Sequence, residues 1–227
     1  MTADELIKKF QGIVITDEMK QRAKEESQKR ESDIMHHFET NSFTQEQTDQ
    51  IGFYGEFAFR KILGMDWKEG IREDYKTIDS NDLNINNWSI DVKTESIPEY
   101  FIWQVLDKSI RDNDWYGRRL FHTGQQRNLE KYNLVMMGSV KRENIFADID
   151  AWFPIGWAYA NKITDYPSGK KGPLHHNGKK NIWYPFSGFQ ITTTDLKTGI
   201  RFRRNNQTYQ IKIMGFLLNY ENRMSSL

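Results

Sequence analysis

The sequence predicts a mixed α/β fold, and three observations carry that prediction. An apolar stripe at helical spacing runs along residues 44–63. Apolar and polar residues alternate over 82–92, which is the pattern of a half-buried β-hairpin. Two later segments, 131–140 and 151–163, are apolar enough to form buried strands. A helix, a hairpin and later strands in one chain favour a mixed sheet packed against helices.

Residues 15–39 are polar and contain many acid–base pairs at three- or four-residue spacing. Such pairs stabilise a helix on its solvent-facing surface, so this segment predicts an exposed helix. His36 and His37 end the segment, where a positive charge would suit the helix C-terminus.

A second helix is expected to begin at Thr44, because Thr44 and Gln47 have the spacing of a capping box. Gly64 is placed to end this helix as a C-cap. Gly52 and Gly55 would allow the helix to approach a neighbouring backbone closely. The apolar stripe of this helix consists of Ile51, Tyr54, Gly55, Ala58 and Ile62.

Residues 80–95 predict two strands joined by a two-residue turn at Asn86 and Asn87, because asparagine tolerates the positive φ of type I′ turns. In that register Leu83 faces Ile90. Successive side chains of a strand point to opposite faces, so the hairpin has one apolar and one polar face. The apolar face, expected to be buried, comprises Leu83, Ile85, Trp88, Ile90 and Val92. The polar face comprises Asp82, Asn84, Ser89, Asp91 and Lys93.

The rest of the chain is less regular. Residues 97–131 mix helix and loop, and Pro154 and Gly156 are expected to break the last long strand. Residues 165–190 are rich in glycine and proline and predict a loop. Two short strands are expected after it, at 200–204 and 208–218.

The composition excludes several classes of function. The chain has 227 residues and no cysteine, which excludes disulfides, cysteine nucleophiles and thiolate metal sites. Any metal must therefore bind oxygen or histidine ligands. No apolar run approaches the roughly 20 residues that span a bilayer, and the first residues lack the pattern of a signal peptide. We therefore expect a cytoplasmic protein without a membrane partner.

The first chemical signal is a pair of opposed aspartates. Directly opposed residues of two antiparallel strands have Cβ atoms about 4.5–5.5 Å apart, so Asp82 and Asp91 would repel each other unless a cation lies between them. Mg²⁺ is typically held by one or two carboxylates together with substrate phosphate. The alternative is a solvent-facing hairpin in which Lys93, on the same face, merely neutralises Asp91.

The second signal is Glu56, which has apolar neighbours on the surface of the helix over 44–63. A carboxylate beside a buried stripe needs a partner, because an unpaired buried charge is costly. The alternatives are that Glu56 reaches solvent or pairs with Arg60 one turn later.

Three pieces of sequence, in this order, resemble the PD-(D/E)XK nuclease superfamily: Gly55-Glu56-Phe57-Ala58, Asp82, and Asp91-Val92-Lys93. That family has an acidic residue on a first helix, an aspartate on a strand, and a D/E-X-K tripeptide on the next strand. The resemblance covers roughly residues 44–163. One departure is that Asn81, rather than proline, precedes Asp82. Asp74 and Asp79 are competing candidates for the first aspartate, but the hairpin register points Asp79 away from the polar face.

The resemblance implies a restriction-endonuclease-like core and metal-dependent hydrolysis of a phosphodiester bond. Asp82 and Asp91 would hold Mg²⁺, for which Mn²⁺ is expected to substitute, with the Val92 carbonyl as a third ligand. Glu56 would complete the shell directly or through water. Lys93 would orient or deprotonate the attacking water and offset charge in the transition state.

The charge is distributed unevenly. Residues 1–64 and 65–164 each carry a net charge of −3, whereas residues 165–227 carry +7. A basic region beside a nuclease-like core favours DNA as the partner. The cations expected to contact phosphates are Lys170, Lys171, Lys179, Lys180, Arg201, Arg203 and Arg204. The aromatic residues among them, Trp183, Tyr184 and Phe186, can stack on bases or pack the region internally.

These observations divide the chain into an N-terminal helical region (1–43), a nuclease-like core (44–163) and a basic extension (164–227) that packs on the core and binds nucleic acid. The expected activity is that of a metal-dependent DNA endonuclease. The alternatives are a junction-resolvase type of nuclease, an RNA endonuclease, and a non-catalytic DNA-binding protein of the same fold. A double-strand cutter would often be a homodimer, because one active site cuts one strand.

The histidines support other metal chemistry only weakly. His175 and His176 lie in a basic stretch but lack the further spaced histidine that an HNH-type site needs. His36 or His37 could mimic the helix histidine of a cap-snatching RNA endonuclease.

Overall fold

The fold is organised around a five-stranded mixed sheet with the strand order β1-β6-β5-β3-β2. Its strands are Ile13–Val14 (β1), Leu83–Ile85 (β2), Trp88–Pro98 (β3), Leu134–Arg142 (β5) and Ala151–Tyr159 (β6). β3 and β5 are parallel, and the other neighbouring pairs are antiparallel. The predicted mixed α/β class is therefore confirmed.

The structure is a computed structural model, and it describes residues 3–33, 43–71, 82–85, 87–112, 114–122, 125–142, 150–165, 173–176, 179–183, 188–204 and 207–212. Within these ranges, no helix has both the length and the apolar character that a membrane span requires.

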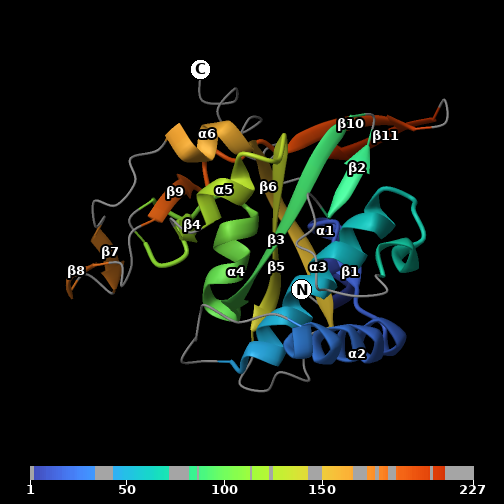
Figure 1. Ribbon diagram of the computed structural model, residues 1–227. Coiled ribbons are helices and arrows are strands. Elements are labelled where there is room, and N and C mark those ends of the chain that lie inside the picture. The colour runs from blue at the N-terminus through green and yellow to red at the C-terminus, as the bar shows by residue number, and fades with distance from the viewer. Residues whose placement is uncertain are drawn as a thin grey trace.

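Helices cover both faces of the sheet (Figure 1). The helices α2 (Asp17–Asp33) and α3 (Gln45–Ile62) pack on one face, where Val92 and Met136 point into the same apolar cluster. The helix α4 (Glu99–Leu106) packs on the other face with Ile97, Val135 and Met137. The short helices α1 (Ala3–Lys9), α5 (Gln126–Leu129) and α6 (Ala160–Asp165) contribute to the α4 side, and the 3-10 turn η1 (Trp67–Gly70) follows α3.

The helix α3 has the limits that its sequence predicts. The Thr44 side chain accepts a hydrogen bond from the Gln47 N–H, and the Gln47 side chain accepts one from the Thr44 N–H, so the capping box is present. Gly64 has a φ of 66° just beyond the helix, a conformation that glycine adopts without strain. A Cβ added at Gly55 would lie 1.8 Å from Thr94 Oγ1, so Gly55 allows α3 to lie directly on β3; at Gly52 there is no such contact.

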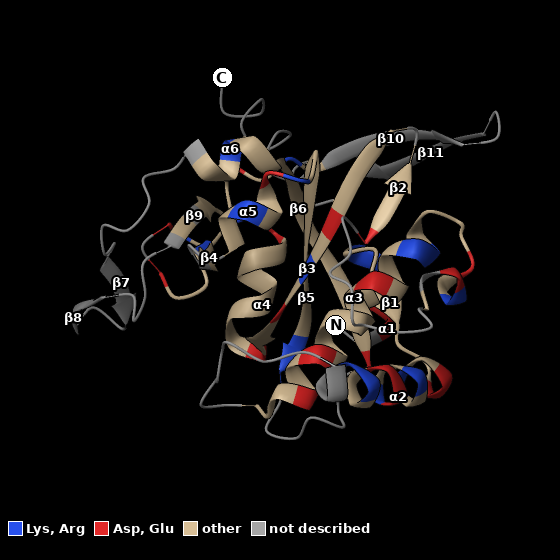
Figure 2. Ribbon diagram, viewed as in Figure 1, with Lys and Arg blue, Asp and Glu red and all other residues tan. Residues whose placement is uncertain are grey.

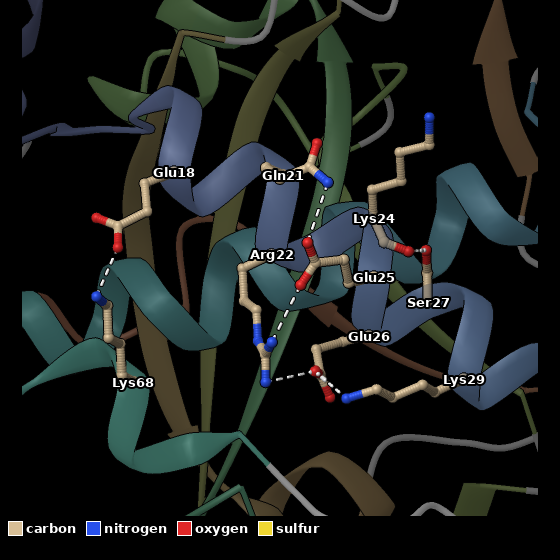
Figure 3. A network of polar contacts seen from close by, with 9 residues as sticks. All are labelled: Glu18, Gln21, Arg22, Lys24, Glu25, Glu26, Ser27, Lys29 and Lys68. Atoms are coloured by element: carbon tan, nitrogen blue, oxygen red, sulfur yellow. Dashed lines mark hydrogen bonds and ion pairs between the residues drawn. The ribbon is translucent and has the colours of Figure 1, made fainter.

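The helix α2 differs from the exposed helix that its sequence predicts. Met19, Ala23 and Glu26 are fully buried against the core. Glu26 is neutralised by Arg22 and Lys29, whose nitrogens lie 3.0 and 2.9 Å from its Oε1 (Figure 3). The predicted acid–base pairs therefore form. They also satisfy a carboxylate on the buried side of the helix, which the polar sequence conceals.

The hairpin β2–β3 has the predicted register, in which Leu83 pairs with Ile90 and Ile85 with Trp88. Asn87 has a φ of 68°, as the expected turn requires. Four of the five residues on the apolar face are buried, but Trp88 is 40% exposed, contrary to prediction. Trp88 lies at the tip of the hairpin, where its ring packs against Tyr159 in a tilted arrangement.

The strand β6 continues through Pro154 and Gly156, where a break was expected. The register with β5 shifts there, because Met137 pairs with Gly156 whereas the next residue, Gly138, pairs with Pro154. Ile155 is the extra residue of this bulge, and a bulge accommodates a proline that has no N–H to donate.

Segments from both ends of the chain join the fold. The strand β1 pairs with β6, and β9 (Gly188–Thr192) pairs with β4 (Arg118–His122). Phe189, Ile191 and Leu196 are buried in the cluster on the α4 side. The expected loop at 165–190 contains an antiparallel pair, β7 (Pro173–His176) with β8 (Lys179–Trp183). The two strands predicted last are β10 (Gly199–Arg204) and β11 (Gln207–Lys212), which pair with each other.

Candidate active site on the β2–β3 hairpin

The hairpin brings Asp82 next to Asp91. The Asp82 N–H donates to the Ile90 carbonyl at 3.1 Å, which extends the strand contact by one residue. The Asp82 carboxylate accepts a 2.7 Å hydrogen bond from the Val92 N–H through Oδ2. Asp82 is therefore held against the backbone of β3, one residue from Asp91.

Asp91 is buried and has two charged neighbours. Lys93 Nζ donates a 2.9 Å hydrogen bond to Oδ1 and lies 2.9 Å from Oδ2 as an ion pair. Oδ2 itself receives no hydrogen bond. Burial raises the pKa of Asp91 to about 6; Asp82 adds to the rise and Lys93 opposes it. Both oxygens of the carboxylate therefore face the Lys93 ammonium group, and only Oδ1 accepts a hydrogen bond from it.

Lys93 is the cation beside Asp82 and Asp91, and it lies on their solvent-facing side. Its side chain is 37% exposed, so the ammonium group contacts both Asp91 and solvent. Burial lowers the pKa of Lys93, but the carboxylates of Asp91 and Asp82 outweigh that effect and raise the pKa above its ordinary value. Lys93 is therefore protonated at neutral pH in this arrangement, which suits charge stabilisation and orientation better than proton abstraction.

Glu56 lies on α3, which packs on the face of the sheet that carries Val92. Side chains alternate along a strand, so Asp91 and Lys93 leave β3 on the other face. Glu56 Oε2 lies 3.9 Å from Arg60, and Arg60 also donates a 2.5 Å hydrogen bond to the Asp82 carbonyl. Arg60 thus connects Glu56 to the hairpin through the Asp82 backbone.

Within the described ranges, no three Asp, Glu or His side chains come together with the geometry that could hold a metal ion. The structure brings Asp82, Asp91 and Lys93 together, and Glu56 pairs with Arg60 on α3. Val92 takes part through its N–H group, which binds Asp82.

The polar face of β3 continues beyond the predicted residues. Glu95 follows Lys93 on the same face and lies 2.8 Å from Arg119 of β4. The Arg119 side chain is 0% exposed, and it also donates to the Tyr116 carbonyl. Burial raises the pKa of Glu95 and lowers that of Arg119, while each partner opposes the shift of the other. Alternation along the strand placed Glu95 on this face, but nothing local in the sequence marked Arg119 as its partner.

Other polar groups surround Arg119. Lys108 Nζ donates a 2.8 Å hydrogen bond to the Thr193 carbonyl, and the Thr193 hydroxyl donates to the Tyr116 carbonyl at 3.3 Å. The Tyr116 hydroxyl accepts a 3.0 Å hydrogen bond from Arg142. These bonds connect the loop after α4 to the segment after β9. Figure 2 shows acidic and basic residues alternating along β3.

The predicted phosphate-binding cations belong to the C-terminal part of the chain. Lys170 and Lys171 lie outside the described residues. Lys179 and Lys180 belong to β8, and the three predicted arginines belong to β10, but only the backbone of these strands is described. His36 and His37 also fall outside the described residues.

Divalent metal chemistry fits the donor set of the hairpin in one respect. Mg²⁺ and Mn²⁺ prefer carboxylate oxygens, and Asp91 offers a buried oxygen without a hydrogen bond beside a second carboxylate. A metal ion there would replace Lys93 as the charge partner of Oδ2.

Comparison with protein-family models, with curated proteins and with solved structures finds no match for this chain.

Proposed function

We propose that the protein is a metal-dependent DNA endonuclease with a restriction-endonuclease-like core, and that the β2–β3 hairpin is its active site. The observation that carries this proposal is the contact of Asp91 with both Asp82 and Lys93. Two adjacent carboxylates with an ammonium group beside them suit metal-assisted phosphodiester hydrolysis, because carboxylates hold the metal ion and the ammonium group stabilises developing negative charge.

Each side chain has a role that follows from its contacts. Asp91 and Asp82 would hold Mg²⁺ or Mn²⁺, which lowers the pKa of bound water and stabilises charge on phosphate oxygens. Lys93, already charged and partly exposed, orients the attacking water and offsets the negative charge that develops on the phosphate. The N–H of Val92 fixes the orientation of Asp82. Arg60 binds the Asp82 carbonyl and Glu56, so Glu56 acts through Arg60 on the position of the hairpin.

A second candidate is a DNA-binding protein that lacks catalysis. The observation that favours it is the ion pair itself, because Lys93 lies 2.9 Å from both oxygens of Asp91 and neutralises it without a metal. In that case the hairpin is a structural element, and the basic C-terminal region provides the DNA affinity.

Cleavage of a circular plasmid separates the two candidates. The wild-type protein is expected to convert supercoiled DNA to nicked or linear forms in Mg²⁺ and to be inactive in EDTA. Asp91→Asn removes the charge but keeps the size of the side chain, so it should reduce cleavage to background while the circular dichroism spectrum stays unchanged. DNA binding without cleavage by the wild type in Mg²⁺ and in Mn²⁺ would favour the non-catalytic candidate.

A further inference from the structure

Three aromatic side chains form a continuous group at the end of the central sheet where the β2–β3 hairpin turns. The Trp88 and Tyr159 ring centroids are 6.1 Å apart with an interplanar angle of 35°. The Tyr159 and Trp157 centroids are 5.2 Å apart at 86°. We call Trp88, Tyr159 and Trp157 the aromatic strip. It joins β3 to β6 across the beginning of β5, because Tyr159 is paired with Leu134.

The aromatic strip is only partly covered. Trp88 is 40% exposed and Tyr159 is half-buried, whereas Trp157 belongs to the core. A single exposed indole on a protein surface needs no explanation. An exposed indole that packs against further aromatic rings forms a larger aromatic surface, on which another planar group can stack.

Lys197 places a positive charge on this surface. Its Nζ lies 4.4 Å from the Tyr159 centroid and 5.0 Å from the Trp157 centroid, within the range of a cation–π contact. The backbone of Lys197 is fixed by two hydrogen bonds, in which the Trp157 N–H donates to the Lys197 carbonyl at 3.0 Å and the Lys197 N–H to the Trp157 carbonyl at 2.9 Å. The fold therefore fixes the Lys197 backbone beside the rings, and its ammonium group contacts them.

Aromatic faces next to a cation are complementary to a nucleotide. A base can stack on an exposed ring, and its phosphate can pair with an ammonium group. In a duplex the faces of the bases are covered by their neighbours, so stacking on a side chain selects nucleotides that are unpaired.

The position of the strip relative to the proposed catalytic residues supports the same substrate. Trp88 precedes Asp91 by three residues on β3, which corresponds to about 10 Å along the strand. The two side chains leave opposite faces, because three is an odd number of residues. A nucleic acid that contacts both must bend around the end of the sheet, which a flexible single strand does far more readily than stiff duplex DNA.

We propose that the aromatic strip and Lys197 bind unpaired nucleotides of single-stranded DNA beside the hairpin. The inference rests on the proposed function, because it names the form of DNA that this site prefers. If the strip instead served only internal packing, Trp88 would contribute to stability and nothing to DNA affinity.

Fluorescence anisotropy with a fluorescein-labelled oligothymidylate tests this proposal. The protein carries Asp91→Asn and the buffer contains EDTA, so cleavage plays no part. We expect tighter binding to the oligothymidylate than to a blunt duplex hairpin of equal length. Adding Trp88→Ala should weaken oligothymidylate binding about fivefold or more, the lower end of what stacking contributes per base. Lys197→Gln should reduce the salt dependence by about 0.7 units of slope, one phosphate contact on a single strand.

Tyr100→Ala is the matched control, because Tyr100 is an exposed aromatic residue on α4 at 75% exposure. It should leave oligothymidylate affinity unchanged. Equal affinities for Trp88→Ala and Tyr100→Ala, or equal losses for duplex and single strand, would overturn the proposal. The nuclease proposal has a separate outcome. If oligothymidylate binding depends on Trp88 but the wild type cleaves no DNA, the nuclease proposal is rejected and single-strand binding by the aromatic strip is supported. If the wild type cleaves DNA but binding does not depend on Trp88, the proposal for the aromatic strip is rejected and the nuclease proposal is supported.

Discussion

Two acid–base pairs lie on the same face of β3, and their surroundings differ. Asp91 pairs with Lys93 of its own strand, and a second carboxylate, Asp82, lies beside it. Glu95 pairs with Arg119 from β4, whose side chain has no exposure to solvent. The first pair is local, partly exposed and has excess negative charge. The second joins distant segments and has a second basic group nearby, because Arg119 is close enough to Lys108 to lower the pKa of Lys108.

This difference indicates two different uses of buried charge. A carboxylate pair with a partly exposed cation can exchange that cation for a metal ion. A carboxylate held by a fully buried guanidinium cannot, because removal of the arginine would leave an uncompensated charge inside the fold. We therefore assign chemistry to the Asp91 pair and assembly of the α4 side to the Glu95 pair.

The largest expected effect concerns Lys93. Lys93→Ala should lower the cleavage rate by about 10²–10⁴-fold, the usual contribution of a positioned acid–base or charge-stabilising group. Single-turnover cleavage of a labelled plasmid measures the chemical step directly. The cleavage rate of Lys93→Ala is compared with that of Arg119→Lys, a variant that retains the positive charge of the second pair. A Lys93→Ala variant as active as wild type would remove Lys93 from the mechanism.

A smaller effect is expected in the second pair. Arg119→Met should destabilise the fold by up to about 3 kcal/mol, because Glu95 is only 29% exposed and would lose its partner. The double variant Glu95→Gln/Arg119→Met should regain much of that loss, since no charge is then left unpaired. Urea unfolding of both variants and of wild type gives these values. Equal stabilities of the single and double variants would contradict the pairing.

The smallest effect is a dependence of stability on pH from Lys108. Burial lowers the pKa of Lys108 from 10.5 to about 7, and Arg119 adds to the shift. Between these values the unfolded chain holds a proton that the folded chain has released, so stability rises with pH in this window. Below about pH 7 both states are protonated, and the full penalty is present.

Lys108→Met removes this titration. Wild type should therefore gain stability relative to the variant from pH 7 to pH 9, by less than about 1.4 kcal/mol per pH unit because Lys108 is partly exposed. Urea unfolding of both proteins at the two pH values measures the difference. A constant difference would show that Lys108 titrates normally in the folded protein.

The sequence predicts the hairpin and α3 well because their determinants are local. The turn at Asn87, the alternation of the strands and the Thr44 capping box each depend on neighbouring residues. The Glu95–Arg119 pair depends on how β4 is positioned by β9, which lies far along the chain. No periodicity within either segment reports that pairing.

The sequence-based predictions of burial were wrong for α2 and for Trp88, and both errors have the same physical origin. The buried side of α2 consists of Met19, Ala23 and Glu26, and this stripe is too short and too polar to stand out from the charged residues around it. Trp88 follows the apolar alternation of its strand, but the helix that buries its neighbours does not cover it. Burial is decided by what packs on a face, which tertiary structure determines.

The central claim, that Asp82 and Asp91 share a metal ion and Lys93 does not bind it, is tested most directly by calorimetric titration of Mn²⁺. Wild type is expected to bind Mn²⁺ at one site, and Asp82→Ala should weaken that binding. Lys93→Ala should retain or strengthen it, because the ammonium group that repels the ion is gone and Asp91 Oδ2 is left free for it. Loss of Mn²⁺ binding in Lys93→Ala together with unchanged binding in Asp82→Ala would contradict the account.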